Sequence, residues 1–132
     1  MSARETILIV EDEVSLLNIL QDKLTREGFN VLAAKNGKEG LDVALSEHPD
    51  LILLDIDLPV MDGVTTLQGI RADPWGKIAR VIMLTNSNDY KSVADTLALG
   101  SYDYLVKSDW KLDDLMTIVH EKFSGQPPLS FN

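Results

Sequence analysis

The stretch LILLDIDLPVMDG, residues 51 to 63, is the most informative segment for the fold, because its apolar run ends abruptly in the carboxylate of Asp55. A short run of Leu and Ile bounded by turn-forming residues is typical of a strand buried on both faces of a parallel sheet. Pro59 is the turn-forming residue that follows. The stretch therefore predicts a buried strand that carries an acid to the carboxyl edge of a sheet.

Four further apolar runs share this character, and helical patterns separate all five. Within the helical segments, apolar residues recur at a spacing of three and four, which gives each helix one face for a core. The predicted strands are residues 6–10, 30–34, 50–55, 79–85 and 102–106. The predicted helical stripes are Leu17, Leu20 and Leu24; Leu41, Ala44 and Leu45; Val64, Leu67 and Ile70; Tyr90, Val93, Ala94, Leu97 and Ala98; and Leu112, Leu115, Met116 and Val119.

This alternation is a (βα)5 pattern of the α/β class. Crossovers of this length favour parallel pairing and right-handed connections, so helices are expected on both faces of the sheet. We therefore predict a three-layer, doubly wound fold around a parallel five-stranded sheet.

Length and composition limit what the chain can do. Its 132 residues, 45% of them hydrophobic, suit one compact domain, predicted at residues 1–123, with a flexible tail at residues 124–132. The net charge of −9 repels a phosphate backbone, so no direct contact with nucleic acid is expected. The chain has no cysteine, and its apolar run at Ile7–Val10 is too short for a signal peptide or a membrane span. We expect a cytoplasmic protein with no membrane segment.

Chemically active side chains gather at the predicted carboxyl ends of four strands. Glu11 and Asp12 follow the first strand, Asp55 ends the third, Thr85 ends the fourth and Lys107 follows the fifth. In an open parallel sheet, ligands bind outside the carboxyl ends of the strands. Any one of these acids could be an ordinary helix-start or turn residue. Together they predict one pocket.

Three carboxylates in one pocket repel one another, by about 3 kcal/mol for a pair about 5 Å apart at an effective dielectric constant of 20. The cluster should therefore hold a proton or a cation. Oxygen ligands without Cys or a suitable His favour Mg2+, which keeps open positions for phosphate oxygens. Lys107 and Thr85 would add a positive charge and a hydroxyl donor for a phosphate. The pocket suits phosphoryl chemistry.

Four segments together resemble the CheY-like receiver domain of two-component response regulators. They are ILIVED at residues 7–12, DIDLPVMDG at 55–63, LT at 84–85 and YLVK at 104–107. The likeness extends from Ile7 to about Phe123. It implies a flavodoxin-like sheet with strand order 2-1-3-4-5, an order that the periodicity alone does not predict.

The resemblance also implies a role for each site residue. Asp55 matches the phosphoacceptor, Thr85 the switch hydroxyl, Lys107 the phosphate-contacting lysine and Tyr104 the switch aromatic residue. Glu11 and Asp12 match the acidic metal-binding pair, and Asp57 matches the position whose backbone carbonyl completes the Mg2+ shell. The histidines, His48 and His120, lie away from the strand ends and are expected to face solvent or to be structural.

A function follows from the resemblance. The expected protein is a single-domain response regulator, itself no enzyme, that accepts a phosphoryl group on Asp55 from a sensor histidine kinase or a phosphotransfer protein. A downstream effector protein would then recognise the surface formed by residues 88–123. The protein is expected to be a monomer or a weak dimer.

Three departures from the family pattern leave alternatives open. Ser108 stands where proline usually follows the lysine, Asn86 stands where a small residue usually follows Thr85, and Asp57 adds a fourth acid. One alternative is a pseudo-receiver adaptor that is not regulated by phosphorylation. The other is a small Mg2+-dependent phosphatase, because Asp55 and Asp57 resemble the acid pair of haloacid-dehalogenase-type enzymes. In that family, however, a small hydroxyl residue usually follows the pair, whereas here Leu58 and Pro59 follow it.

Overall fold

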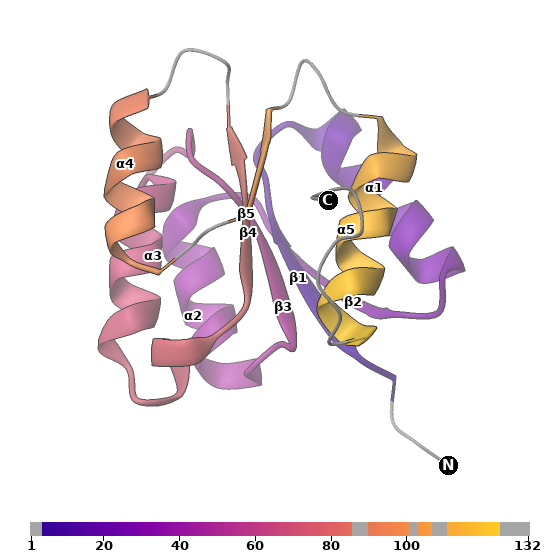
Figure 1. Ribbon diagram of the computed structural model, residues 1–132, viewed down its shortest axis with the longest axis horizontal. Coiled ribbons are helices and arrows are strands. Elements are labelled where there is room, and N and C mark those ends of the chain that lie inside the picture. Colours follow the sequence, from indigo (N-terminus) through magenta and orange to yellow (C-terminus); the bar gives the residue numbers. More distant parts are fainter. Residues whose placement is uncertain (1–3, 86–89, 101–102, 107–110, 125–132) are drawn as a thin grey trace, which may run out of the picture.

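The computed structural model describes residues 4–85, 90–100, 103–106 and 111–124. In this part of the chain, five strands alternate with five helices, and a short 3-10 helix precedes the fourth strand (Figure 1). The strands are β1 (Thr6–Val10), β2 (Asn30–Ala34), β3 (Leu51–Asp55), β4 (Val81–Thr85) and β5 (Asp103–Val106). The helices are α1 (Val14–Arg26), α2 (Gly37–Glu47), α3 (Gly63–Ala72), η1 (Trp75–Ile78), α4 (Tyr90–Ala98) and α5 (Leu112–Ser124).

All four strand pairings are parallel, and the order in the sheet is β2-β1-β3-β4-β5. Helices α1 and α5 cover one face of the sheet, while α2, α3 and α4 lie on the other (Figure 1). The doubly wound α/β fold and the strand order implied by the resemblance are both confirmed.

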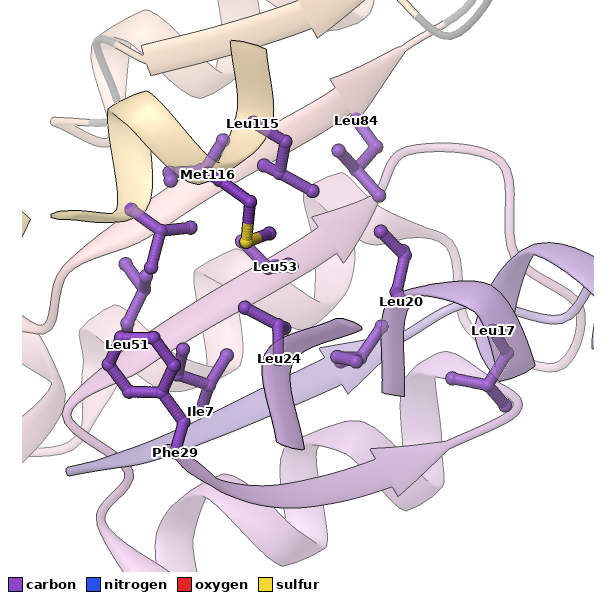
Figure 2. Packing of buried hydrophobic residues seen from close by; sticks show 13 residues of the cluster. Ile7, Leu17, Leu20, Leu24, Phe29, Leu51, Leu53, Leu84, Leu115 and Met116 are labelled. Carbon is purple, nitrogen blue, oxygen red and sulfur yellow. The ribbon is translucent and has the colours of Figure 1, made fainter. Parts of the chain in front are cut away.

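Successive residues of each central strand point to opposite faces, as the pleat requires. The odd-numbered β3 residues Leu51 and Leu53 belong to a core under α1 and α5, whereas Ile52 and Leu54 belong to a second core under α2 and α3. In the first core, side chains of the strands face Leu20 and Leu24 of α1 and Leu115 and Met116 of α5 (Figure 2). A central strand that is buried on both faces explains the continuous apolar run before Asp55.

Side-chain caps begin two of the helices on the second face. The Asn36 side chain accepts a hydrogen bond from the Glu39 amide at 2.8 Å at the start of α2. Asp62 accepts one from the Thr65 amide at 2.8 Å at the start of α3. Each cap satisfies an amide that has no partner inside its helix. The second cap also ends the loop that follows Asp55.

The expected apolar stripe of α4 is wrong for the residues whose side chains are described. Ala94 and Ala98 are exposed, and Leu97 is 43% exposed, whereas Thr96 is the buried residue among the side chains described for this helix, from residue 94 on. The period of the pattern predicted the helix correctly. Which face turns inward is decided by packing against the neighbouring helix α3.

The fourth strand was predicted at residues 79–85, but β4 begins two residues later, at Val81, because η1 occupies the segment before it. The Arg71 guanidinium donates hydrogen bonds to the carbonyls of Gly76 and Ala79, both at 2.7 Å, which stabilises this turn. At the other end of the chain, α5 includes Ser124, which the sequence analysis assigned to the tail. The rest of the predicted tail lies outside the described residues.

Candidate functional site

The strand register brings three acids and a hydroxyl to one edge of the sheet. Val10 pairs with Leu54, so Glu11 comes level with Asp55 on the neighbouring strand. Asp55 in turn pairs with Leu84, which puts Thr85 one residue beyond it. Since parallel strands end at the same edge, the side chains converge there.

These side chains differ sharply in their exposure. Glu11, Asp55 and Thr85 are buried, with exposed fractions of 0%, 1% and 3%. Asp12 and Asp57 are exposed. The buried residues form the floor of the site, and Asp12 lies at its opening to solvent.

One carboxylate oxygen each from Glu11, Asp12 and Asp55 lies within 4.8 Å of the others. At this separation each like-charged pair repels by about 3 kcal/mol at an effective dielectric constant of 20, and by less where water screens it. Three convergent carboxylate oxygens fit a hard cation such as Mg2+, which uses a few protein oxygens and completes its shell with water. The donor set therefore fits the predicted metal.

Backbone amides orient two of the three carboxylates. The Glu13 amide, at the start of α1, donates to Glu11 Oε2 at 3.0 Å. The Asp57 amide donates to Asp55 Oδ1 at 3.1 Å. Both carboxylates are therefore held by the loops that directly follow their strands, which limits their rotation.

Asp57 enters the site through its main chain. Its amide contacts Asp55, while its side chain is not part of the group of three carboxylates. A ligand role for its backbone carbonyl remains a prediction.

Two glycines that the sequence pattern did not single out leave the space in which the loop after Asp55 lies. A Cβ atom on Gly63 would lie 2.2 Å from the Asp55 carbonyl oxygen. One on Gly37 would lie 1.8 Å from the Met61 carbonyl oxygen. Neither position has room for a side chain. The signal in the sequence was that a glycine directly follows each cap residue: Gly37 follows Asn36, and Gly63 follows Asp62.

Two further predicted site residues are Tyr104, which belongs to β5, and Lys107, which follows β5 in the sequence. Tyr104 pairs with Met83 in the sheet, and Val106 pairs with Thr85. Lys107 lies outside the described residues, as do Asn86 and Ser108. Their predicted roles and effects stay predictions.

Both histidines are exposed, as expected. His48 follows α2 and stacks on Trp75, with ring centroids 4.5 Å apart. His120 hydrogen-bonds to Glu27 at 3.0 Å and thereby connects α5 to the end of α1. This hydrogen bond is the main cause of the lowered pKa of Glu27.

The comparisons with known proteins agree with this geometry. The family model described as the response regulator receiver domain matches residues 7–120. The response regulator ArlR of Staphylococcus aureus is 38% identical over 121 residues, which cover 92% of this chain and 53% of that protein. The probable transcriptional regulator ycf27 of Guillardia theta is 38% identical over 107 residues, which cover 81% of this chain and 41% of that protein. The chain thus spans about half the length of these curated relatives, or less.

Two solved structures extend the likeness to the fold. A CheY-like receiver domain protein from Methanospirillum hungatei is 29% identical, with a TM-score of 0.84 over 93% of this chain and 96% of that one. The receiver domain of a sensor histidine kinase from Pseudomonas aeruginosa is 30% identical, with a TM-score of 0.82 over 94% of this chain and 100% of that one. The second structure has a magnesium ion coordinated in its active-site cleft.

Within the described ranges, no helix combines the length and the apolar character that crossing a bilayer requires.

Proposed function

Since this chain belongs to the response regulator receiver domain family of two-component signalling, we propose that Asp55 is its phosphoacceptor and that a sensor histidine kinase or a phosphotransfer protein is the donor. Receiver domains are phosphoacceptors rather than enzymes. The observation that carries the proposal is the convergence of oxygens from Glu11, Asp12 and Asp55 within 4.8 Å.

In the proposed reaction, an oxygen of Asp55 attacks phosphorus, and the bond from phosphorus to the donor nitrogen breaks. The product is an acyl phosphate on Asp55 and a free imidazole on the donor. Glu11, Asp12 and Asp55 would hold Mg2+, with the Asp57 carbonyl as a further ligand, and the ion would offset the charge on the phosphoryl oxygens. The hydrogen bond from the Asp57 amide to Asp55 Oδ1 supports the role of Asp55 as nucleophile, because it orients the attacking carboxylate.

Thr85 is proposed to donate its hydroxyl to the phosphoryl group. It ends β4 beside Asp55, and the new group brings three acceptor oxygens and about two negative charges. Lys107 would contact the same oxygens, and Tyr104 would change its orientation with Thr85. If phosphorylation shifts the ratio of the active to the inactive conformation from 1:99 to 99:1, the phosphoryl group must stabilise the active conformation by about 5.5 kcal/mol more than the inactive one.

The output surface is proposed to be residues 88–123, which include α4, β5 and α5. The apolar side chains of Ala94, Leu97 and Ala98 are exposed on α4, with Leu97 43% exposed, which supports a role in docking an effector protein. We further propose that residues 1–123 belong to the receiver unit, whose last helix extends to Ser124. The protein would act in the cytoplasm as a monomer or a weak dimer, without direct contact with nucleic acid or membrane.

The decisive experiment measures phosphorylation from a small-molecule donor. With acetyl phosphate and Mg2+, intact-mass spectrometry should find one phosphoryl group, located on Asp55. Labelling should disappear in Asp55→Asn and fall strongly in Glu11→Gln or in EDTA. The matched control is Glu47→Gln, which removes an exposed carboxylate at the end of α2 and should label normally.

Other outcomes of this experiment identify the alternatives. Normal labelling of Asp55→Asn would reject the assignment of the phosphoacceptor. A folded chain that takes no label from acetyl phosphate or from a kinase would be a pseudo-receiver. Steady turnover of a generic phosphate ester would instead identify a phosphatase.

A further inference from the structure

The amino edge of the sheet, opposite the carboxylate site, carries a second recess in the surface. It consists of two adjoining hollows of about 380 and 240 Å3, which share Ile78, Ala79 and Arg80. We call this recess the amino-edge groove. The larger hollow alone is within the range of about 300–1,000 Å3 that is usual for binding sites.

One end of the amino-edge groove, the larger hollow, is lined by aromatic and apolar side chains and also by two carboxylates, Glu5 and Asp50. The His48 ring stacks on Trp75 with an interplanar angle of 8°, and Phe123 of α5 lines the same hollow. Ile78, the last residue of η1, is 89% exposed. An isolated exposed Ile is ordinary, but one beside a recess lined by three rings is typical of an interaction surface.

The other end of the groove is basic. The charged residues that line the smaller hollow are Arg71, Arg80 and Lys122, with no carboxylate among its described lining residues. Arg71 donates to the carbonyls of Leu99, Gly76 and Ala79, and Arg80 donates to the carbonyl of Lys122. Carbonyl oxygens satisfy the N–H groups but carry no formal charge, so the positive potential of the guanidinium groups remains.

This basic end stands out against the charge of the whole chain, which is −9. Lys77 of η1, which is exposed, adds a further cation beside Ile78. The protein as a whole repels anions, and so do Glu5 and Asp50 in the larger hollow. The cations of the smaller hollow therefore determine the end of the groove at which the carboxylates of a ligand bind.

We propose that the amino-edge groove binds an acidic peptide segment of a partner protein. An apolar side chain of that segment packs against Trp75 and Ile78, and its carboxylates face Arg80 and Lys122. The 89% exposure of Ile78 favours a protein segment over a small metabolite, because a ligand confined to the hollows covers only the part of this side chain that lines them. The groove lies at the opposite edge of the sheet from Asp55, so it offers a second point of attachment besides the phosphorylated surface.

The probe is a fluorescein-labelled peptide with the core Glu-Glu-Leu-Phe-Asp-Glu, and binding to the full chain is measured by fluorescence anisotropy. Two control peptides carry the cores Gln-Gln-Leu-Phe-Asn-Gln and Glu-Glu-Ser-Ser-Asp-Glu. We expect the first peptide to bind at least about tenfold more tightly than either control, since charge and apolar contact both contribute. Its affinity should fall as salt concentration rises.

Variants of the protein test the location. Arg80→Glu and Ile78→Ser should each weaken binding of the acidic peptide at least about tenfold. The matched controls lie on α1, where Arg26→Glu and Ile19→Ser change exposed residues of the same types and should leave the affinity unchanged. Arg80→Gln serves as the second variant if Arg80→Glu does not fold, which circular dichroism checks.

NMR titration supplies an independent readout. Peptide binding should shift the Trp75 indole signal and the Ile78 methyl signals. The proposal is overturned if the neutral peptide binds equally well, if Arg80→Glu and Ile78→Ser bind normally, or if the shifts fall on Glu11 and Asp12. It is also overturned if the Trp75 signal moves with protein concentration alone, because a second copy of the chain would then be the occupant.

Discussion

Replacing Asp12 by asparagine should stabilise the metal-free protein and weaken its response to Mg2+. Asp12 is the exposed member of the three carboxylates, so the substitution removes a charge without opening a cavity. The other two carboxylate oxygens lie within 4.8 Å, so at that separation each pair contributes about 3 kcal/mol of repulsion at a dielectric constant of 20 and about 1 kcal/mol in water. Because solvent screens Asp12, we expect a gain in the free energy of unfolding of about 1–2 kcal/mol.

Thermal unfolding monitored by circular dichroism measures this effect. In EDTA, the gain should raise the Tm of Asp12→Asn above that of the unaltered protein by about 3–6 °C. In Mg2+ at a hundred times the Kd, the unaltered protein should gain about 2.7 kcal/mol, whereas a site weakened a hundredfold gains about 0.4 kcal/mol at the same concentration. The order of the two Tm values should therefore reverse between EDTA and Mg2+.

Glu47→Gln, which also neutralises one exposed acid, is the control and should show neither effect. A lower Tm for Asp12→Asn in EDTA would show that the carboxylates do not repel one another. An equal rise of both proteins in Mg2+ would show that Asp12 is not a ligand. Either result would refute the reasoning from the carboxylate geometry.

Three further predictions follow from the same structure. Leu53→Ala creates a cavity at a fully buried position in β3 and should lower the free energy of unfolding, measured by urea titration, by about 2–5 kcal/mol. A loss below about 1 kcal/mol would contradict the packing shown in Figure 2. The pKa of Glu27 is lowered mainly by its hydrogen bond with His120. The ionised carboxylate therefore stabilises the folded protein at pH values above its ordinary pKa of 4.5, and this stabilisation is lost as the pH falls through the lowered pKa. In Glu27→Gln, the free energy of unfolding, measured by urea titrations across pH, should therefore depend less on pH in this acidic range. An unchanged pH dependence would show that the contact between Glu27 and His120 does not stabilise the protein. Gly37→Ala places a Cβ 1.8 Å from the Met61 carbonyl oxygen and should slow labelling of Asp55 by acetyl phosphate, because it displaces the loop. Gly28→Ala strains the backbone at φ +99° but meets nothing within 4 Å, so it controls for lost stability and should label at the normal rate; equal rates in both variants would contradict the positioning role.

Much of the fold could be predicted from local patterns. The run at residues 51–55 is continuous because β3 is central in the sheet and buried on both faces. The stripe of Leu17, Leu20 and Leu24 is buried as its period predicted. The segment at Trp75–Ile78 escaped prediction because a single turn of 3-10 helix is too short to have a period, and Arg71 stabilises it from another element.

Periodicity also could not identify the inner face of α4. Its pattern favoured Leu97, yet Leu97 is 43% exposed while its neighbour Thr96 is fully buried. Several apolar residues around a helix are compatible with more than one orientation, and contacts with neighbouring elements decide among them.

Local patterns in the sequence were enough to predict the class of fold, the ends of most strands and the kind of residues at those ends, because burial and hydrogen bonding act on neighbours along the chain. The strand order came from the resemblance to a family. Three relations became known from the folded structure: Glu11, Asp12 and Asp55 meet within 4.8 Å, Gly37 leaves room for the loop, and Arg71 and Arg80 line one groove. These relations join residues far apart in the sequence, and their distances depend on the register of strands and the packing of helices, which no local pattern contains.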